Sequence, residues 1–243
     1  MTGAPEEGFA DVNGASLYYD VAGNGEPLVL VHAGIADRRM WDGQLEAFLH
    51  GLLNFLGIQR AILVGCSIGA RTVIDFALAH PARVPALVCP TVSGFESDEE
   101  SPEEWDELVV ADEAGDLERV SELEVRIWVD GPYRSPDHVD PVARDLLREI
   151  NLIALRKEPD LGKERLAQRS AVNRLAEIQA PTLVVGGDLD RPEVDVRAKL
   201  LLRSILRAQK VITNGTAHVP SMEKPEEFNR VVLGFLSGVS GAG

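Results

Sequence analysis

The chain has 243 residues, enough for one α/β domain with an inserted subdomain and a substantial core. Its formal net charge of −15 argues against nucleic acid or an anionic membrane as a partner, and no apolar run approaches the roughly 20 residues of a membrane span. The two cysteines are too few for a disulfide framework, and the first residues lack the pattern of a signal peptide, so the sequence predicts a cytoplasmic protein.

Apolar runs predict strands in the first part of the chain. Residues Phe9–Val12 and Ser16–Val21 flank the turn pair Asn13-Gly14, which predicts a hairpin. Residues Pro27–His32 form a continuous apolar run that is typical of a buried parallel strand. From about residue 42 to residue 56, leucine and phenylalanine recur at helical spacing, which predicts a helix.

A Gly-x-Ser-x-Gly pattern at residues 65–69 stands between a predicted strand, Ala61–Val64, and a predicted helix, Arg71–Ala79. A chain that turns sharply from a buried strand into a helix needs small neighbours, which the two glycines and the alanine after them provide. The helix start also directs backbone N–H groups at an oxyanion formed nearby. We therefore predict that Ser67 is a nucleophile whose hydroxyl is exposed at the carboxyl end of the sheet.

The middle of the chain departs from strand–helix alternation. After a short predicted strand, Ala86–Cys89, the sequence becomes acidic, and residues 105–169 show helical patterns broken by proline and glycine. We interpret this part as a helical cap laid over the site. The predicted division is a first core segment at 1–95, a cap at 96–170 and a second core segment at 171–243.

Three aromatic residues of the predicted cap, Trp105, Trp128 and Tyr133, are candidates for the substrate pocket. Packing within the cap is the alternative explanation for each of them. An acidic surface around an aromatic interior suits small, uncharged or weakly polar acyl substrates better than polyanions.

Strand–helix alternation resumes after the predicted cap. Residues Thr182–Val185 and Val211–Thr213 are predicted strands, with a helix at about Glu193–Leu206 between them. Pro225, followed by two glutamates, begins a last predicted helix that ends near Leu236.

A serine nucleophile needs a base that is itself oriented by a carboxylate. His218 lies in the loop after the last predicted strand, where site residues of open α/β sheets gather, and is the predicted base. Asp190, just past strand Thr182–Val185, is the predicted acid; Asp188 in the same loop and Glu96 are the alternatives. The other histidines, which are better explained as packed or solvated side chains, are His32, His50, His80 and His138.

Six short segments carry a family pattern: 32–34 (His-Ala-Gly), 41–42 (Trp-Asp), 65–69 (Gly-Cys-Ser-Ile-Gly), 187–190 (Gly-Asp-Leu-Asp), 217–220 (Ala-His-Val-Pro) and 223–228 (Glu-Lys-Pro-Glu-Glu-Phe). Together they resemble the α/β-hydrolase superfamily, in the branch of 3-oxoadipate enol-lactonases, small esterases and non-haem haloperoxidases. The chain order serine, aspartate, histidine is also that of the superfamily. The resemblance implies a mostly parallel sheet flanked by helices, and an oxyanion hole from the backbone N–H groups of Gly34 and Ile68. Ala33 stands where the family usually has glycine.

One departure from the family pattern is larger. In the family, another parallel strand precedes the helix that leads to the elbow strand, and nothing near Phe48–Gly51 reads as such a strand. Either the chain lacks this strand, so that one helix spans about Asp42–Leu56, or a segment is missing from the sequence. We favour a missing segment, because loss of a central strand would isolate the hairpin and expose core. Unbroken Cα spacings of about 3.8 Å along Gln44–Leu53 would contradict this.

These observations predict that the protein is a cofactor-independent serine hydrolase, which forms an acyl-enzyme from a small carboxylic ester or lactone. No cluster of His, Cys and carboxylates has metal-ligand spacing, and no dinucleotide or phosphate loop occurs, so we expect no metal and no cofactor. We expect no nucleic acid or membrane partner. C–C bond hydrolysis or perhydrolysis by the same triad is one alternative, and a non-catalytic binding or signalling protein with a retained hydrolase fold is another.

Overall fold

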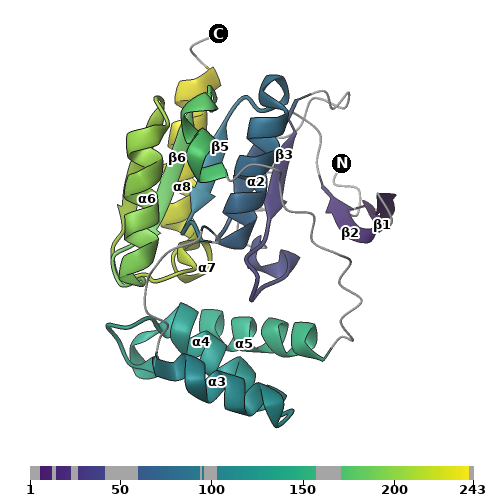
Figure 1. Cartoon of the computed structure of the whole chain (residues 1–243), viewed down its shortest axis with the longest axis vertical. Helices are drawn as coiled ribbons and strands as arrows, with labels where there is room; N and C mark the ends of the chain where they lie inside the picture. Colours follow the sequence, from purple (N-terminus) through teal and green to yellow (C-terminus); the bar gives the residue numbers. More distant parts are fainter. Residues whose placement is uncertain are drawn as a thin grey trace.

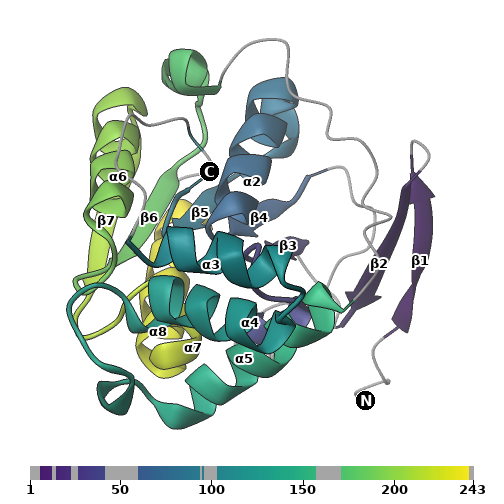
Figure 2. The same ribbon diagram turned by 60° about the horizontal axis from the view of Figure 1, so that its bottom comes forward.

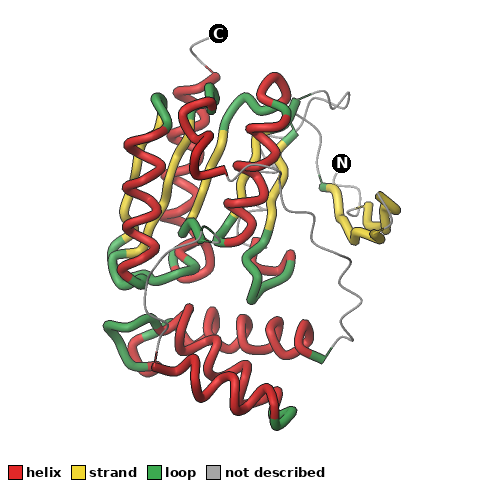
Figure 3. The backbone as a smooth tube through the Cα atoms, viewed as in Figure 1, coloured by secondary structure: helices red, strands yellow, loops and turns green. Residues whose placement is uncertain are grey.

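The computed structural model describes residues 6–12, 15–22, 27–41, 60–93, 95, 103–156 and 171–240. At its centre is a parallel sheet with helices on both faces, and a layer of helices lies across one end of that sheet (Figure 1 and Figure 3). The predicted α/β architecture with an inserted helical cap is confirmed.

Hydrogen bonding divides the described strands into two sheets. An antiparallel hairpin of β1 and β2 forms one, and a parallel sheet of five strands in the order β3-β4-β5-β6-β7 forms the other. The strands are β1 (Glu6–Val12), β2 (Ala15–Val21), β3 (Leu28–Val31), β4 (Ile62–Gly65), β5 (Leu87–Pro90), β6 (Thr182–Gly187) and β7 (Ala208–Thr213).

The central strands are apolar because both faces of the sheet are covered. Every residue of β4 and β5 is buried, as expected for parallel strands between two helical layers. On one face, α2 (Ile68–Ala79) and α6 (Pro192–Ser204) pack with the 3-10 helix η5 (Ala171–Glu177). On the other face, α8 (Pro225–Ser240) contributes Phe228 and Val232 to the core.

The cap consists of the helices between β5 and η5. They are α3 (Glu103–Glu113), α4 (Leu117–Val125), a π-helical turn η3 (Arg126–Asp130), a 3-10 turn η4 (Pro136–His138) and α5 (Pro141–Leu155). Asp116 and Asp140 precede α4 and α5, and each accepts a hydrogen bond from a backbone N–H of the first turn. Such N-caps fix where the helices begin.

The cap shares a hydrophobic core with the sheet. Val129 of η3 and Leu147 of α5 belong to the same buried cluster as Ala33, Met40 and Val219 of the core. Figure 2 shows α3, α4 and α5 lying across the end of the sheet near β3 and β4. The cap is therefore packed onto the part of the core that carries the predicted site.

The predicted elements that fall on described residues are present with shifted ends. Helix α2 begins at Ile68 rather than Arg71, because the residue before it, Ser67, makes the sharp turn. Helix α6 ends at Ser204 instead of Leu206, α8 continues to Ser240, and β7 already begins at Ala208. No described helix is long and apolar enough to cross a membrane.

Several predictions fall on residues 42–59, 96–102 and 157–170, which lie outside the described residues. They are the helix at Asp42–Leu56, the strand question near Phe48–Gly51, the outer limits of the cap and the alternative acid Glu96. Among the described residues, β3 pairs with β4 directly, and the hairpin pairs with no strand of the parallel sheet.

Candidate active site

Ser67 occupies the sharp turn between β4 and α2. Its φ is 57° and its ψ is −118°, a conformation that costs energy for any residue other than glycine. The turn is so tight that a Cβ atom on Gly65 would lie 2.2 Å from the carbonyl oxygen of Gly69. The glycine before the serine is therefore required by packing, as expected of a nucleophile elbow.

Ser67 is less accessible than the sequence predicted. The residue is 8% exposed, so the expectation of an exposed hydroxyl is wrong. The cap lies over the carboxyl end of the sheet, and its residue Trp128 reaches the histidine next to the serine. Sequence patterns predicted the cap but not how closely it covers the nucleophile.

The structure brings Ser67, His218 and Asp190 into one hydrogen-bonded chain. His218 Nε2 is 2.9 Å from Ser67 Oγ, and His218 Nδ1 is 3.1 and 3.0 Å from the two carboxylate oxygens of Asp190. A carboxylate can only accept, so Nδ1 carries the hydrogen and Nε2 of the neutral ring accepts from the serine. His218 is 1% exposed and Asp190 is 7% exposed, so water is largely excluded from the chain.

The alternative acids are placed differently. Asp188 is exposed, and its Oδ1 accepts a hydrogen bond from the backbone N–H of Gly215, which braces the loop before the histidine. Asp190 is held by the backbone N–H of Arg191 at 2.8 Å. Asp190 is therefore the carboxylate that contacts His218 among the described residues.

Buried side chains fix the backbone of His218. Thr91 Oγ1 donates to the carbonyl oxygen of His218 at 2.8 Å, and the thiol of Cys66 lies 3.3 Å from the same hydroxyl. Burial raises the pKa of the Cys66 thiol to about 12. Because the thiolate is the reactive form of cysteine, Cys66 is a packing residue at neutral pH and not a competing nucleophile.

The predicted oxyanion donors are free to bind an oxygen. The backbone N–H groups of Gly34 and Ile68 have no acceptor among the residues that the structure describes. Gly34 is exposed, and a Cβ atom placed on it would meet nothing within 4 Å. Ile68 begins α2, where unpaired N–H groups and the helix dipole favour a negative charge.

The aromatic candidates separate into one that contacts the triad and two that do not. The Trp128 ring lies 4.8 Å from the His218 ring, measured between centroids, and the Trp128 carbonyl accepts from the His218 N–H at 3.3 Å. Trp105 is 40% exposed and Tyr133 is 60% exposed, and neither makes a hydrogen bond or ring contact with the triad among the described residues. Of the three candidates, the structure brings only Trp128 to the site.

A buried ion pair links the cap to the core next to His218, and the sequence analysis did not predict it. The side chains of Arg134 and Glu223 are 7% and 4% exposed, and they pair directly. Arg134 also donates to the carbonyls of Val129 and Gly215, while Glu223 accepts from the N–H of Ala217 at 2.8 Å. Burial raises the pKa of the Glu223 carboxyl, and the Ala217 N–H and the Arg134 guanidinium oppose that shift. Glu223 belongs to a motif seen in the sequence, but no local pattern pairs it with Arg134.

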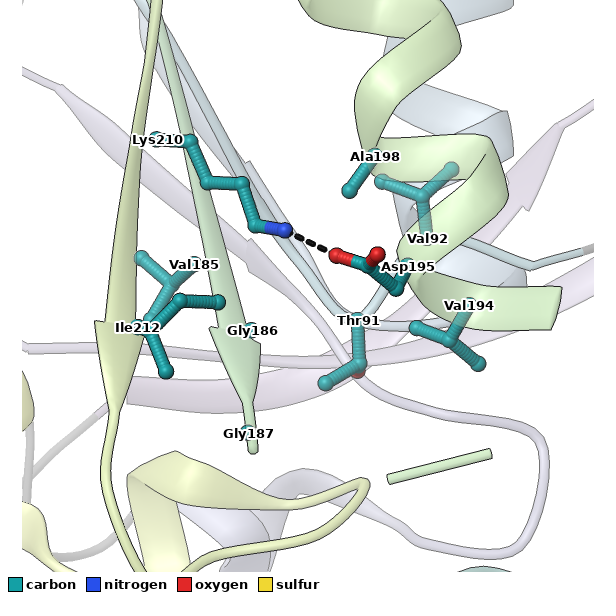
Figure 4. A pocket seen from close by; sticks show the side chains of 10 residues that line it. All are labelled: Thr91, Val92, Val185, Gly186, Gly187, Val194, Asp195, Ala198, Lys210 and Ile212. Atoms are coloured by element: carbon teal, nitrogen blue, oxygen red, sulfur yellow. Dashed lines mark hydrogen bonds and ion pairs between the residues drawn. The ribbon is translucent and has the colours of Figure 1, made fainter. Parts of the chain in front are cut away.

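A separate small cleft between β6, β7 and α6 is not the site. It has a volume of about 10 Å³, room for roughly one water molecule. Figure 4 shows Lys210 and Asp195 paired across it, with Thr91 and Val185 among its walls. No group of three or more His, Cys, Asp or Glu side chains within the described ranges could hold a metal ion.

Comparison with known proteins decides the family. A sequence model of the Alpha/beta hydrolase family matches residues 8–231. The chain belongs to the alpha/beta hydrolase family.

Curated relatives of this alpha/beta hydrolase include hydrolases of 2-hydroxy-6-oxo acids. A 2-hydroxy-6-oxononadienedioate/2-hydroxy-6-oxononatrienedioate hydrolase of Pseudomonas putida is 34% identical over 209 residues, which are 77% of this chain and 66% of that protein. A 2-hydroxy-6-oxo-6-phenylhexa-2,4-dienoate hydrolase of Comamonas testosteroni is 27% identical over 203 residues, 76% of this chain and 66% of that protein. The chain thus matches 66% of the length of both relatives.

A solved structure has a similar fold. The enol-lactonase of Burkholderia xenovorans LB400 superposes with a TM-score of 0.73 at 19% identity, covering 95% of this alpha/beta hydrolase and all of that chain (100%). This similarity concerns the fold alone, because the sequence identity is low.

Proposed function

We propose that this alpha/beta hydrolase cleaves carboxylic ester or lactone bonds through Ser67, His218 and Asp190. The observation that carries the proposal is the unbroken series of hydrogen bonds from Asp190 through His218 to Ser67, at 3.0 and 2.9 Å. Serine becomes a useful nucleophile when an adjacent base accepts its proton and a carboxylate orients that base. The strained conformation of Ser67 supports the same role.

Acylation follows from this arrangement. Ser67 Oγ bonds to the carbonyl carbon of the substrate while its proton moves to His218 Nε2. The carbonyl oxygen becomes an oxyanion, which the N–H groups of Gly34 and Ile68 bind. His218 then gives its proton to the leaving oxygen as the ester bond breaks, and Asp190 stabilises the imidazolium in the meantime.

C–C bond hydrolysis is a second candidate, supported by the curated relatives. These relatives are named as hydrolases of 2-hydroxy-6-oxo acids, which carry carboxylate groups. Two arginines that join cap and core are already paired with carboxylates, Arg134 with Glu223 and Arg39 with Glu149. Because the chain also has a net charge of −15, an uncharged ester or lactone is the better substrate class.

A substrate panel tests the proposal. We expect p-nitrophenyl acetate, p-nitrophenyl butyrate or a γ- or δ-lactone to give a higher kcat/KM than 2-hydroxy-6-oxo-6-phenylhexa-2,4-dienoate. Ser67→Ala serves as the control for hydrolysis outside the site. Preference for the dienoate would favour the second candidate, and preference for phosphorylated or strongly acidic esters would contradict the substrate class.

A further inference from the structure

A second hydroxyl lies against the proposed nucleophile. Ser93 Oγ is 2.7 Å from Ser67 Oγ, and Ser93 is 9% exposed. Among the residues that the structure describes, Ser67 is the one hydrogen-bond partner of the Ser93 side chain. The triad chemistry given above makes no use of this hydroxyl.

The direction of the hydrogen bond follows from the rest of the network. Both carboxylate oxygens of Asp190 accept from His218 Nδ1, which leaves Nε2 as the acceptor of the neutral ring. Ser67 therefore donates its single hydrogen to Nε2. The hydrogen between the two serines must then come from Ser93, so Ser93 donates and Ser67 Oγ accepts.

The backbone holds Ser93 in this position. The Ser67 N–H donates to the carbonyl of Pro90 at 3.1 Å, and the Ser93 N–H donates to the carbonyl of Ser67 at 3.4 Å. Between them, Thr91 has a φ of 44°, which is costly for a β-branched residue. The Thr91 N–H donates to the carbonyl of Val185 at 2.8 Å, which ties this turn to β6. Strain of this kind persists where the surrounding structure holds it, often at a functional site.

We propose that Ser93 is a fourth catalytic side chain, whose hydroxyl stabilises the negative charge on Ser67 Oγ as the bond between this oxygen and the acyl carbon forms and breaks. The inference rests on the proposed function and adds a residue to the same site. Its donor is already in place before the charge develops, so little reorganisation is needed when it does.

The effect is expected most clearly in deacylation. Water bonds to the acyl carbon and gives a proton to His218 Nε2, and the carbonyl oxygen becomes an oxyanion. When this tetrahedral intermediate collapses, the bond between carbon and Ser67 Oγ breaks and its electron pair goes to Oγ. The proton returns from Nε2 to Oγ, and the acid product leaves. A hydrogen bond from Ser93 lowers the barrier to this step because it stabilises the departing oxygen.

A pair of variants with the same shape isolates the hydroxyl. Ser93→Thr keeps the donor, whereas Ser93→Val replaces it with a methyl group. We expect Ser93→Val to lower kcat about 10- to 100-fold relative to Ser93→Thr, the factor for one hydrogen bond to a charged group. A p-nitrophenyl ester that shows a burst of product separates the two steps, and the deacylation rate should fall more than the burst rate. On such a substrate KM should fall together with kcat, because slower deacylation lets the acyl-enzyme accumulate.

A buried serine outside the site provides the matched control. Ser121 of α4 is buried, and its hydroxyl donates to the carbonyl of Arg148 in the cap. Ser121→Ala, like Ser93→Val, removes a buried serine hydroxyl, but we expect it to keep the wild-type kcat. The urea midpoint of every variant should be measured alongside, so that a loss of folded protein is not read as a loss of catalysis.

The outcomes separate this inference from the proposed function. If the wild type hydrolyses esters through Ser67 but Ser93→Val and Ser93→Thr are equally active, the role of Ser93 is wrong and the proposed function stands. Equal losses in both variants with a lowered urea midpoint would also overturn it, because they would assign Ser93 to packing. If the wild type is inert toward every ester, lactone and serine-directed probe, both proposals are wrong.

Discussion

Ser67→Ala should lower kcat by about a million-fold, the size of the loss when a serine hydrolase loses its nucleophile. The variant removes one oxygen from a residue that is 8% exposed and keeps the Cβ atom, so the elbow and its strain stay the same. We therefore expect an unchanged urea midpoint. The measurement is kcat on the best substrate of the panel, together with urea unfolding of the wild type and the variant.

Ser121→Ala is again the suitable control, because it removes a hydroxyl from a buried serine in the cap. It should leave kcat at the wild-type value. If Ser67→Ala kept even a tenth of the wild-type rate, Ser67 would not be the nucleophile, and the hydrolysis would have to come from another group.

Asp190→Asn should lower kcat by about 10⁴-fold, as in other hydrolases whose triad aspartate becomes asparagine. The carboxylate accepts from His218 Nδ1 at 3.0 Å and thereby keeps the hydrogen on that nitrogen. An amide can present its NH₂ group to Nδ1, which then becomes an acceptor and moves the ring hydrogen to Nε2. The histidine can no longer accept the proton of Ser67. KM should change little, since Asp190 lies behind the histidine.

Asp188→Asn makes the same chemical change in the same loop. Asp188 accepts from the backbone N–H of Gly215, and the amide oxygen of asparagine can do so too. We expect this variant to keep most of its activity. Equal losses in Asp188→Asn and Asp190→Asn would mean that the loop, and not the carboxylate of Asp190, supports the histidine.

Local sequence patterns were sufficient to predict the site residues that follow the ends of strands. The Gly-x-Ser-x-Gly turn lies between a buried strand and a helix, and His218 and Asp190 follow later strands of the same sheet. Parallel strands bring their carboxyl ends to one edge, so residues at those ends meet although they are far apart in the sequence. This is why the contacts among the three residues were predictable before the structure was known.

Contacts between cap and core could not be predicted in the same way. Arg134 and Glu223 are separated by 89 positions, and no sequence pattern around either residue predicts that the two side chains form an ion pair. The contact between Trp128 and His218 depends on how the cap packs against the sheet. Hydrophobic periodicity predicts the helices of the cap but not their position relative to the sheet. Ser93 was missed because a lone serine after a strand has no distinctive pattern.

Labelling with a fluorophosphonate probe is the decisive test of whether Ser67 is an activated nucleophile. The probe phosphonylates a serine only where a base and an oxyanion site activate it, so it separates a working hydrolase from a binding protein that retained the fold. We predict one adduct, on the peptide that contains Ser67, and no adduct in Ser67→Ala or in denatured protein. Mass spectrometry that found no adduct on the native protein, or found it on another residue, would contradict the assignment of Ser67 as an activated nucleophile.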